Sequence, residues 1–405
     1  MSIIRSHTPQ GPTAPAPVFV LRNDAGLRLT FMEQGATWLS CSLVLADGSR
    51  REVLLGCRDQ AEYRRQRLYV GAVIGRFSHR IRNSCFELDG QLQQLSPNEG
   101  PHHLHGGPEG FDRKDWRVLR YDERELVFGL VSPHGDQGYP GEVTARVCYR
   151  IGEDLSLAIS MSARSTAPCP VGLSQHAYFN LDGDRGGDTA SCLGQRLRVA
   201  ADHWLPIDAD KLPAADLQSV LGRGFDLREG ATLAQAIEAD PTLRAEGGFD
   251  HCLALRPGLA MSQEGESAAE LWSTDGQVSM QLRTDQAALQ VYTGQDLFEV
   301  MARDGRHYPA HAGIALEPQF VPDSMNSAFD TALRPDCILR PGQVWHSCSR
   351  MNFALHPAAS DSRDVTKSQT TLRSVNGSAP GLRAFRALGE AARYWITTKT
   401  WRPAL

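Results

Sequence analysis

The sequence predicts an all-β protein, a large antiparallel β-sandwich with a C-terminal extension. Apolar and polar residues alternate along short segments such as Val143–Ile151. A period of two with one apolar face is typical of half-buried antiparallel strands. Asp-Gly pairs, which suit type I′ hairpin turns, separate such segments at Asp47-Gly48, Asp89-Gly90 and Asp275-Gly276. Because few windows have helical spacing, a sandwich or barrel is favoured.

Composition divides the chain into three segments. Residues 1–17 contain a Pro-rich run and are expected to be extended and disordered. Residues 18–355 carry the strand pattern without a linker-like break and are expected to form the sandwich. Residues 356–405 form a polar, basic tail with a net charge of +5, from eight Lys and Arg against three Asp and Glu.

The basic tail contains one apolar stripe. Pro380 precedes residues at helical spacing, so a short amphipathic helix is one interpretation and a marginal, unattached segment is the other. The stripe consists of Leu382, Phe385, Leu388 and Ala392.

Charge and cysteine usage exclude several classes of protein. The 405 residues carry a net charge of only −5, so the chain as a whole lacks the excess of positive charge that is typical of nucleic-acid-binding proteins. The nine cysteines include no C-x-x-C pair, which favours reduced thiols in a cytoplasmic protein. No stretch approaches the ~20 apolar residues that a membrane span needs, so no membrane partner is expected.

Three stretches carry side chains that handle protons: His105 in Leu104–Gly107, His176 in Gln175–Leu181, and Glu317 in Leu316–Gln319. Histidine titrates near neutral pH, and burial raises the pKa of a glutamate, so together they can donate and accept protons at pH 7. No thiol nucleophile, phosphate loop or cofactor fingerprint competes with them. The set indicates proton transfer on a polar, neutral substrate, and no cofactor is expected.

Taken singly, these residues have plainer interpretations. A lone glutamate that ends an apolar strand, as Glu317 does, is usually solvated or salt-bridged. A histidine with aromatic neighbours, as His176 is, is usually bonded to a backbone carbonyl in the core. Arg80 and Asp250 suit the orientation of sugar hydroxyls but fit a partly buried salt bridge as well.

Three histidines within four residues, at positions 102, 103 and 105, raise the question of a metal site. In a strand His103 and His105 share one face while His102 lies on the other. No Cys, Asp or Glu ligand is adjacent in sequence. We therefore expect no metal here.

Together these stretches resemble the aldose 1-epimerase (galactose mutarotase) family over residues 18–355. The likeness rests on several motifs in the family's order, and not on one. They are G-R-x-x-x-R-I from Gly75, L-H-G-G-x-x-G-F-D from Leu104, Gly138–Gly141, Gln175–Leu181, Gly248–His251, Leu289–Gly294, Leu316–Gln319 with Pro322-Asp323, and Leu339–Gly342.

The resemblance implies a galactose mutarotase-like supersandwich that interconverts the α and β anomers of free aldohexoses such as galactose or glucose. It implies Glu317 as the catalytic base, His176 as the general acid and His105 as a catalytic hydrogen-bond donor. The implied partner is a small aldose sugar, the chemistry needs no metal or other cofactor, and the chain is expected to be a monomer or homodimer. The residues implied to bind the sugar are His79, Arg80, Tyr178, Asp250 and Gln290.

Three positions depart from the family pattern. His79 stands where Asn usually precedes the second arginine, Gln175 stands where Asn commonly precedes the catalytic histidine, and Gly172 replaces a usual Asn. These changes affect the expected sugar preference more than the reaction type.

Two other functions stay open. An epimerase for a hexose 6-phosphate needs a basic cluster, which Arg64, Arg65 and Arg67 could supply, although an exposed loop explains them as well. A non-catalytic sugar-binding module on the same scaffold would not need a poised acid–base pair, so His176 and Glu317 argue against it.

Overall fold

A computed structural model describes residues 17–187, 190–259, 261, 265–326 and 336–357. The chain divides into two units, Met1–Ala359 and Ser360–Leu405, and every described residue belongs to the first. The predictions for residues 1–16 and for the tail from residue 358, including its helix, lie outside the described residues.

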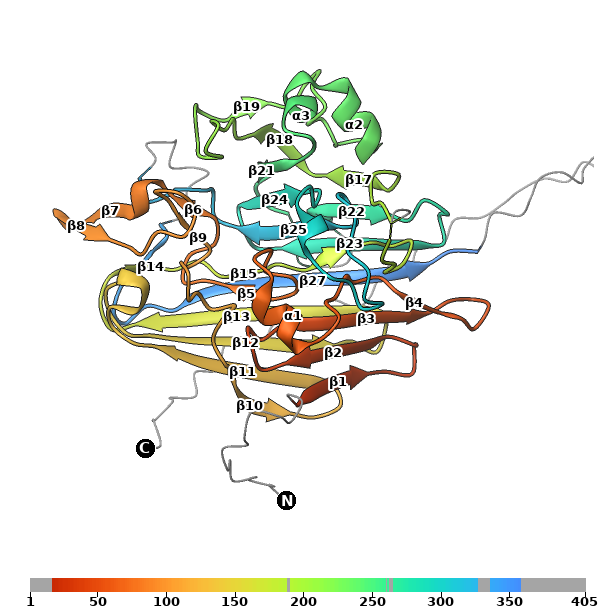
Figure 1. Cartoon of the computed structure of the whole chain (residues 1–405), viewed down its shortest axis with the longest axis horizontal. Coiled ribbons are helices and arrows are strands. Elements are labelled where there is room, and N and C mark those ends of the chain that lie inside the picture. Colours follow the sequence, from red (N-terminus) through yellow and green to blue (C-terminus); the bar gives the residue numbers. More distant parts are fainter. Residues whose placement is uncertain (1–16, 188–189, 260, 262–264, 327–335, 358–405) are drawn as a thin grey trace, which may run out of the picture. The chain divides into compact units, whose positions relative to one another are not determined.

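The largest sheet is antiparallel and has nine strands (Figure 1). In order across the sheet these are β10 (Arg117–Tyr121), β11 (Glu125–Ser132), β12 (Val143–Ile151), β13 (Ser156–Ser165), β27 (Trp345–Leu355), β23 (Val278–Thr284), β22 (Ala269–Trp272), β17 (Arg196–Val199) and β20 (Ala231–Thr232). The strand predicted over Val143–Ile151 is confirmed, since buried residues alternate along β12 with more exposed ones.

A second antiparallel sheet has six strands. In order these are β16 (Tyr178–Phe179), β25 (Ile314–Gln319), β24 (Ala288–Tyr292), β21 (Asp250–Leu255), β18 (Ala201–Trp204) and β19 (Gln218–Ser219). The predicted all-β sandwich is confirmed, because most described elements are strands that pair antiparallel within these and smaller sheets.

The six-stranded sheet turns one face to the core. Leu289, Val291 and Leu316 belong to the main apolar cluster, which also contains Val147 and Leu282 of the nine-stranded sheet. Side chains alternate between the two faces of a strand. The residues between them therefore point to the other face, and this alternation places the polar side chains of β24 and β25 away from the core.

Smaller elements surround the two sheets. A four-stranded sheet contains β1 (Val18–Arg22), β2 (Arg28–Met32), β3 (Trp38–Val44) and β4 (Arg50–Glu52). Four two-stranded pairs are β5 (Val73–Ile74) with β15 (Ser174–Gln175), β6 (Arg80–Ile81) with β9 (His103–Leu104), β7 (Cys85–Leu88) with β8 (Gln91–Gln94), and β14 (Cys169–Pro170) with β26 (Ile338–Leu339). The helices are α1 (Gln60–Arg65), α2 (Leu233–Ala239), α3 (Pro241–Ala245) and the 3₁₀ turns η1 (Arg82–Ser84), η2 (Asp136–Gly138) and η3 (Leu297–Glu299).

The three Asp-Gly pairs do form strand connections, but only one has the predicted turn type. In the β7–β8 hairpin Asp89 has φ 50° and Gly90 has φ 78°, as a type I′ turn requires. At the other two connections only Gly48 and Gly276 have positive φ. The prediction of type I′ turns there is wrong, because both loops are longer than two residues and need just one left-handed residue, at the glycine.

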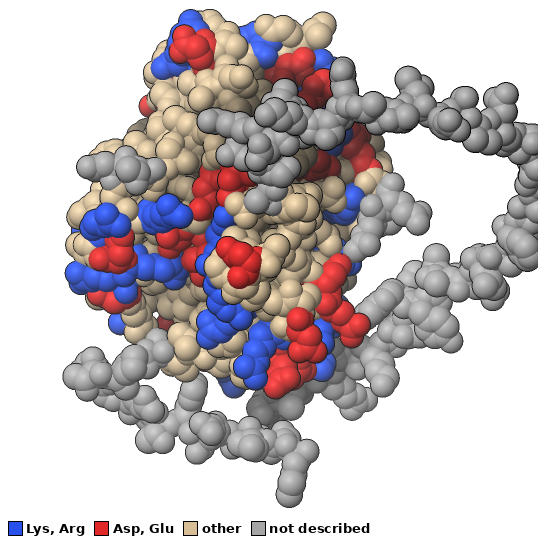
Figure 2. All heavy atoms as spheres, turned by 90° about the vertical axis from the view of Figure 1, so that its right-hand side faces the viewer, with Lys and Arg blue, Asp and Glu red and all other residues tan. Residues whose placement is uncertain are grey.

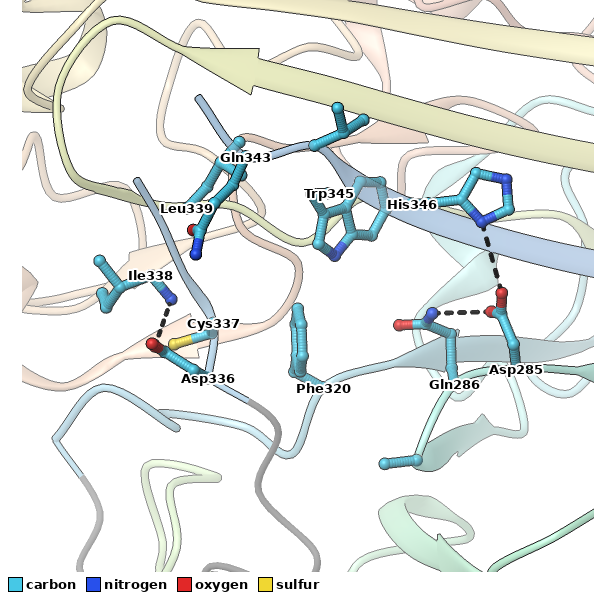
Figure 3. A pocket seen from close by; sticks show the side chains of 12 residues that line it. Asp285, Gln286, Phe320, Asp336, Cys337, Ile338, Leu339, Gln343, Trp345 and His346 are labelled. Carbon is cyan, nitrogen blue, oxygen red and sulfur yellow. Dashed lines mark hydrogen bonds and ion pairs between the residues drawn. The ribbon is translucent and has the colours of Figure 1, made fainter. Parts of the chain in front are cut away.

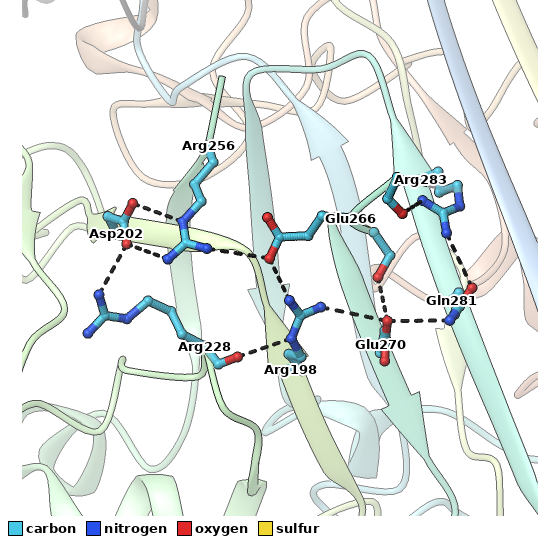
Figure 4. A network of polar contacts seen from close by, with 10 residues as sticks. Arg198, Asp202, Arg228, Arg256, Glu266, Glu270, Gln281 and Arg283 are labelled. Carbon is cyan, nitrogen blue, oxygen red and sulfur yellow. Dashed lines mark hydrogen bonds and ion pairs between the residues drawn. The ribbon is translucent and has the colours of Figure 1, made fainter. Parts of the chain in front are cut away.

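The face of β17, β22 and β23 opposite the apolar side chains carries a polar network (Figure 4). Arg198 contacts Glu266 at 2.5 Å and Glu270 at 3.6 Å, and the Gln281 amide donates to Glu270 at 3.4 Å. The register of the three strands brings these side chains together, since Arg198 pairs with Glu270 and Glu270 pairs with Gln281. The network therefore ties three neighbouring strands together on their polar side.

Charges of both signs are interspersed on the face shown in Figure 2. That face shows no large patch of one sign. Among the described residues, no helix has the length and apolar character that crossing a membrane demands.

Candidate active site

Three side chains that handle protons converge beside the six-stranded sheet. His176 Nε2 lies 3.6 Å from Glu317 Oε1. One ring nitrogen of His105, one of His176 and one carboxylate oxygen of Glu317 all lie within 4.8 Å of one another. The three residues come from distant parts of the sequence, so the fold and not local sequence brings them together.

Glu317 projects from β25 on the face opposite the core. It pairs across strands with Gln290 on β24, so the two side chains share this face. Glu317 is 2% exposed, and its Oε2 has no hydrogen-bond partner among the described residues. Burial, with a further contribution from the Asp250 charge and against the effect of Arg80, raises the pKa of Glu317 well above its usual value. Such a carboxyl group can exchange a proton at a pH where an exposed one is fully ionised.

His176 follows β15 and is fixed by backbone hydrogen bonds. Its N–H donates to Ala72 O at 2.9 Å, and its carbonyl accepts from Gly71 N at 2.9 Å. The preceding Gln175 points elsewhere, because its amide donates to Gly71 O at 2.6 Å and accepts from the Tyr149 hydroxyl at 2.8 Å. Gln175 thus links the turn at Gly71 to Tyr149 on β12. Burial lowers the pKa of His176 to about 4, so its ring is neutral at pH 7.

His105 lies in a tight turn that follows β9, closed by a hydrogen bond from Gly107 N to Leu104 O at 2.9 Å. The backbone N–H of His79 donates to His105 Nδ1 at 3.0 Å, which leaves Nε2 as the protonated, donating nitrogen of the neutral ring. Burial lowers the pKa of His105 well below its usual value, and the His176 charge acts in the same direction. The turn needs Gly106, which has φ 95°, because a Cβ there would lie 1.7 Å from Gly75 O.

Arg80 and Asp250 are each held in a salt bridge, though not with one another. Arg80 Nε lies 2.6 Å from Glu99 Oε2. One oxygen of Asp250 accepts from the Gln290 amide at 2.8 Å, and the other lies 2.7 Å from Lys211 Nζ. Burial acts to raise the pKa of Asp250, but Arg80 and then Lys211 outweigh it, and the pKa lies well below its usual value. Asp250 is therefore an ionised acceptor.

His79 is buried beside Arg80. It is 3% exposed, has φ 69°, and its Nδ1 has no partner among the described residues. Burial and then the Arg80 charge lower the pKa of His79 to about 3, so the ring offers hydrogen bonds without charge.

The departure at Gly172 also has a structural reason, since a Cβ there would lie 2.6 Å from the ring of Phe320.

Two tyrosines pack against the histidines. The ring of Tyr178, which is 1% exposed, lies 5.0 Å from that of His176. The ring of Tyr69 lies 4.6 Å from that of His105 and 5.7 Å from that of His176. These contacts help to fix the two imidazoles.

Eight of the residues described above are the site candidates that the sequence offered. Three others, Tyr69, Glu99 and Lys211, were not among those candidates. Glu99 lies between Asn98 and Gly100 and has the appearance of an ordinary turn residue. Lys211 lies in a polar loop with no strand periodicity. Only the tertiary contacts of these three residues identify them.

His105, His176 and Glu317 also form the one group among the described residues whose ligand atoms are close enough to hold a metal ion. Two neutral imidazoles and a carboxylate are ligands that suit Zn²⁺. The same three groups are equally able to transfer protons. His102 and His103 lie outside this group, since His102 contacts Asp210 and His103 contacts the Tyr139 hydroxyl.

A separate pocket of about 560 Å³ lies between the segment around β26 and the start of β27 (Figure 3). Its walls include Phe320, Trp345 and Asp285 but none of the candidate site residues. The Asp285 carboxylate accepts from Cys348 N at 2.9 Å and 3.0 Å, and Asp336 accepts from Ile338 N at 2.9 Å. Its carboxylates thus cap local backbone. The pocket also contains a His346–Asp285 contact at 3.6 Å, but these side chains are 57% and 34% exposed and lack the burial of His176 and Glu317.

The chain is similar to known proteins of one family. The family model described as aldose 1-epimerase matches residues 17–352. The aldose 1-epimerase of Escherichia coli strain K12 is 39% identical over 84% of this chain and 95% of its own. The galactose mutarotase of Bos taurus is 32% identical over 83% of this chain and 94% of its own.

Solved structures give the same relationship. An aldose epimerase homologue from C. elegans superposes with a TM-score of 0.76 at 27% identity, covering 84% of this chain and 99% of its own. A galactose 1-epimerase from Lactobacillus acidophilus gives a TM-score of 0.70 at 25% identity, covering 83% and 93%.

Proposed function

Since the chain belongs to the aldose 1-epimerase family and is an isomerase, we propose that Glu317 and His176 are the acid–base pair with which it interconverts the α and β anomers of free aldohexoses such as galactose or glucose. The observation that carries the proposal is the 3.6 Å contact between two buried groups whose pKa values are shifted in opposite directions. Pairs of titratable groups with separated pKa values are typical of acid–base catalysis.

The reaction needs two proton transfers in each direction. In ring opening, Glu317 takes the proton from the anomeric hydroxyl while His176 gives one to the ring oxygen, and the C1–O5 bond breaks as the aldehyde forms. Rotation about C1–C2 presents the other face of the carbonyl. Reclosure reverses both transfers, so Glu317 and His176 return to their starting forms and no proton is gained or lost.

The surrounding groups bind and orient the sugar in this proposal. The donating Nε2 of His105 stabilises negative charge that develops on a sugar oxygen. Asp250 and Gln290 supply an ionised acceptor and an amide to the remaining hydroxyls, while Arg80 and His79 supply donors. Tyr178 holds the ring of His176.

Polarimetry on freshly dissolved α-D-galactose and α-D-glucose tests the activity. With EDTA present throughout, the protein should accelerate the approach to anomeric equilibrium above the spontaneous rate. Acceleration abolished by chelation would instead assign the His105, His176 and Glu317 group to a metal ion.

Glu317→Gln tests the role of the base. The change keeps the shape of the side chain but removes its proton acceptor, so kcat should fall by about 10²–10⁴. The exposed Glu238→Gln serves as the control and should match the parent. A Glu317→Gln protein as fast as the parent would contradict the assignment.

The two alternatives predict different results. A hexose 6-phosphate epimerase would prefer the phosphorylated sugar, but Arg65 is paired with Glu62 on its own helix and Arg64 donates to Gln34. A sugar-binding module would bind galactose without accelerating mutarotation.

We also propose a cytoplasmic location and a monomeric or homodimeric state, with no nucleic-acid or membrane partner. All nine cysteines are free thiols, which supports a reducing compartment. Analytical ultracentrifugation tests the oligomeric state, and cell fractionation tests the location.

A further inference from the structure

Lys211 lies at the tip of a tight turn between β18 and β19. Ile207 and Pro213 form a bridge that closes the turn, and Lys211 N donates to Asp208 O at 2.9 Å. The Asp208 carboxylate accepts from the backbone of Asp210 and Leu212, at 3.0 Å each. The turn is therefore built by its own backbone and does not depend on the Lys211 side chain for its shape.

Three charged side chains of this turn reach the residues around the proposed sugar site. Asp208 lies 3.0 Å from Arg82, and Asp210 lies 3.6 Å from His102. Lys211 Nζ lies 2.7 Å from Asp250. Because Asp208 and Asp210 contact residues beside the β6–β9 pair, the turn is fixed at two points before Lys211 makes its contact.

Lys211 is not the sole partner of Asp250. The Gln290 amide already donates to its other oxygen at 2.8 Å. The charge of Arg80 stabilises the ionised form together with that of Lys211. The Lys211 side chain is 31% exposed, so its ammonium group is only partly buried while it touches a site carboxylate. These observations leave its three N–H groups with a role beyond holding Asp250.

We propose that Lys211 is a specificity-determining residue that binds one non-anomeric hydroxyl of the sugar together with Asp250. The hydroxyl donates to the Asp250 carboxylate and accepts from the Lys211 ammonium, an arrangement that uses both hydrogen-bonding functions of the hydroxyl. It distinguishes an axial from an equatorial hydroxyl, because only one orientation meets both groups. The inference rests on the proposed function and adds a residue to the same site.

Lys211→Met tests the proposal, since it keeps the length of the side chain and removes the charge and the donors. KM for the preferred aldohexose should rise about tenfold, as expected for the loss of one charge-assisted hydrogen bond, while kcat changes less than threefold. Lys211→Arg should recover part of the loss. Parent and variant are compared on the 2-, 3-, 4- and 6-deoxy forms of that sugar.

For the parent, KM with one of the deoxy sugars should be about as high as KM of Lys211→Met with the intact sugar. With that deoxy sugar, Lys211→Met should show no further rise in KM. Equal losses with all deoxy sugars would overturn the proposal and leave a structural salt bridge. Asp210→Asn, which removes an anchor of the same turn, should keep the selectivity of the parent. Parent protein that binds sugars without accelerating mutarotation would instead refute the proposed function, and the same deoxy series read by calorimetry would still test Lys211.

Discussion

At the scale of single residues, burial sets the protonation of Glu317 and His176. A buried environment penalises charge, so it raises the pKa of Glu317 and lowers that of His176 to about 4. Because the pKa of Glu317 is raised while that of His176 is lowered to about 4, a single proton shared by the pair rests on the glutamate, and both groups are then neutral. This is the form that drives ring closure, and ring opening starts when the proton moves to His176.

The acid limb of activity follows from this protonation. A second proton on the pair removes the base, and because the ring of His176 has a pKa of about 4, that proton binds only in strong acid. We expect kcat/KM to be flat from pH 7 down to about 5 and to fall with an apparent pKa near 4, a value that belongs to the coupled pair. Rates measured from pH 3.5 to 9, with circular dichroism at each pH, check this. A limb near pH 6.5 with the fold intact would contradict it.

His176→Asn removes the proposed acid and keeps a hydrogen-bonding side chain. Turnover should fall by about 10²–10⁴, while sugar affinity measured by calorimetry changes little. The exposed His203→Asn is the matched control. Lost affinity with unchanged turnover at saturating sugar would assign His176 to binding and not to proton transfer.

At the scale of elements, periodicity predicted strands but not their partners. The alternation in Val143–Ile151 was sufficient to predict β12, because one face of that strand is buried. The pairing of Glu317 with Gln290 was not predictable from spacing, since register between distant strands depends on the whole sheet. Lys211 and Glu99 were not predicted as site residues, because loops have no periodicity from which contacts can be inferred.

The site candidates themselves came from a family resemblance and not from chemistry read in isolation. Taken alone, Glu317 and Arg80 favoured plain interpretations, and Arg80 does form the salt bridge that its plain interpretation suggested. The resemblance brought forward residues that the fold then places near one another. It gave no reason for Gln175 or Gly172, which only their contacts with Tyr149 and Phe320 supply.

The turn that carries His105 depends on Gly106. In Gly106→Ala the new Cβ would meet the Gly75 carbonyl oxygen at 1.7 Å, so the backbone must move, and His105 moves with it. We expect a lower melting temperature and a loss of kcat greater than tenfold. Gly100→Ala, where φ is +56° and the Cβ has open space, should cost only about 1–2 kcal/mol and keep kcat. Equal behaviour of the two variants would show that the close contact at Gly106 is unimportant.

At the scale of the whole molecule, the site exists only when the sandwich is complete. His79 precedes β6 and Glu317 lies on β25, so the site joins segments that are far apart in the sequence. The nine-stranded sheet joins distant segments as well, since β27 pairs with β13 and β23 in its middle. The entropy cost of closing such long loops comes before the free energy gained from their contacts. Catalytic activity should therefore appear only when the whole domain has folded.

The residue that follows β27 still makes contacts with the nine-stranded sheet. His356 N donates to Gln277 O at 2.8 Å, and the His356 ring lies 2.8 Å from the Ser279 hydroxyl, so the residue after β27 still belongs to the sandwich. A chain that ends at Pro357 should therefore keep the mutarotation rate and melting temperature of the full chain. One that ends at Leu355 should keep the rate but lose about 1–2 kcal/mol of unfolding free energy through these two contacts. Polarimetry and thermal unfolding on both truncated proteins test these expectations. A folded, monodisperse protein ending at Pro357 that has lost catalysis would show that the residues beyond 357 take part in the site.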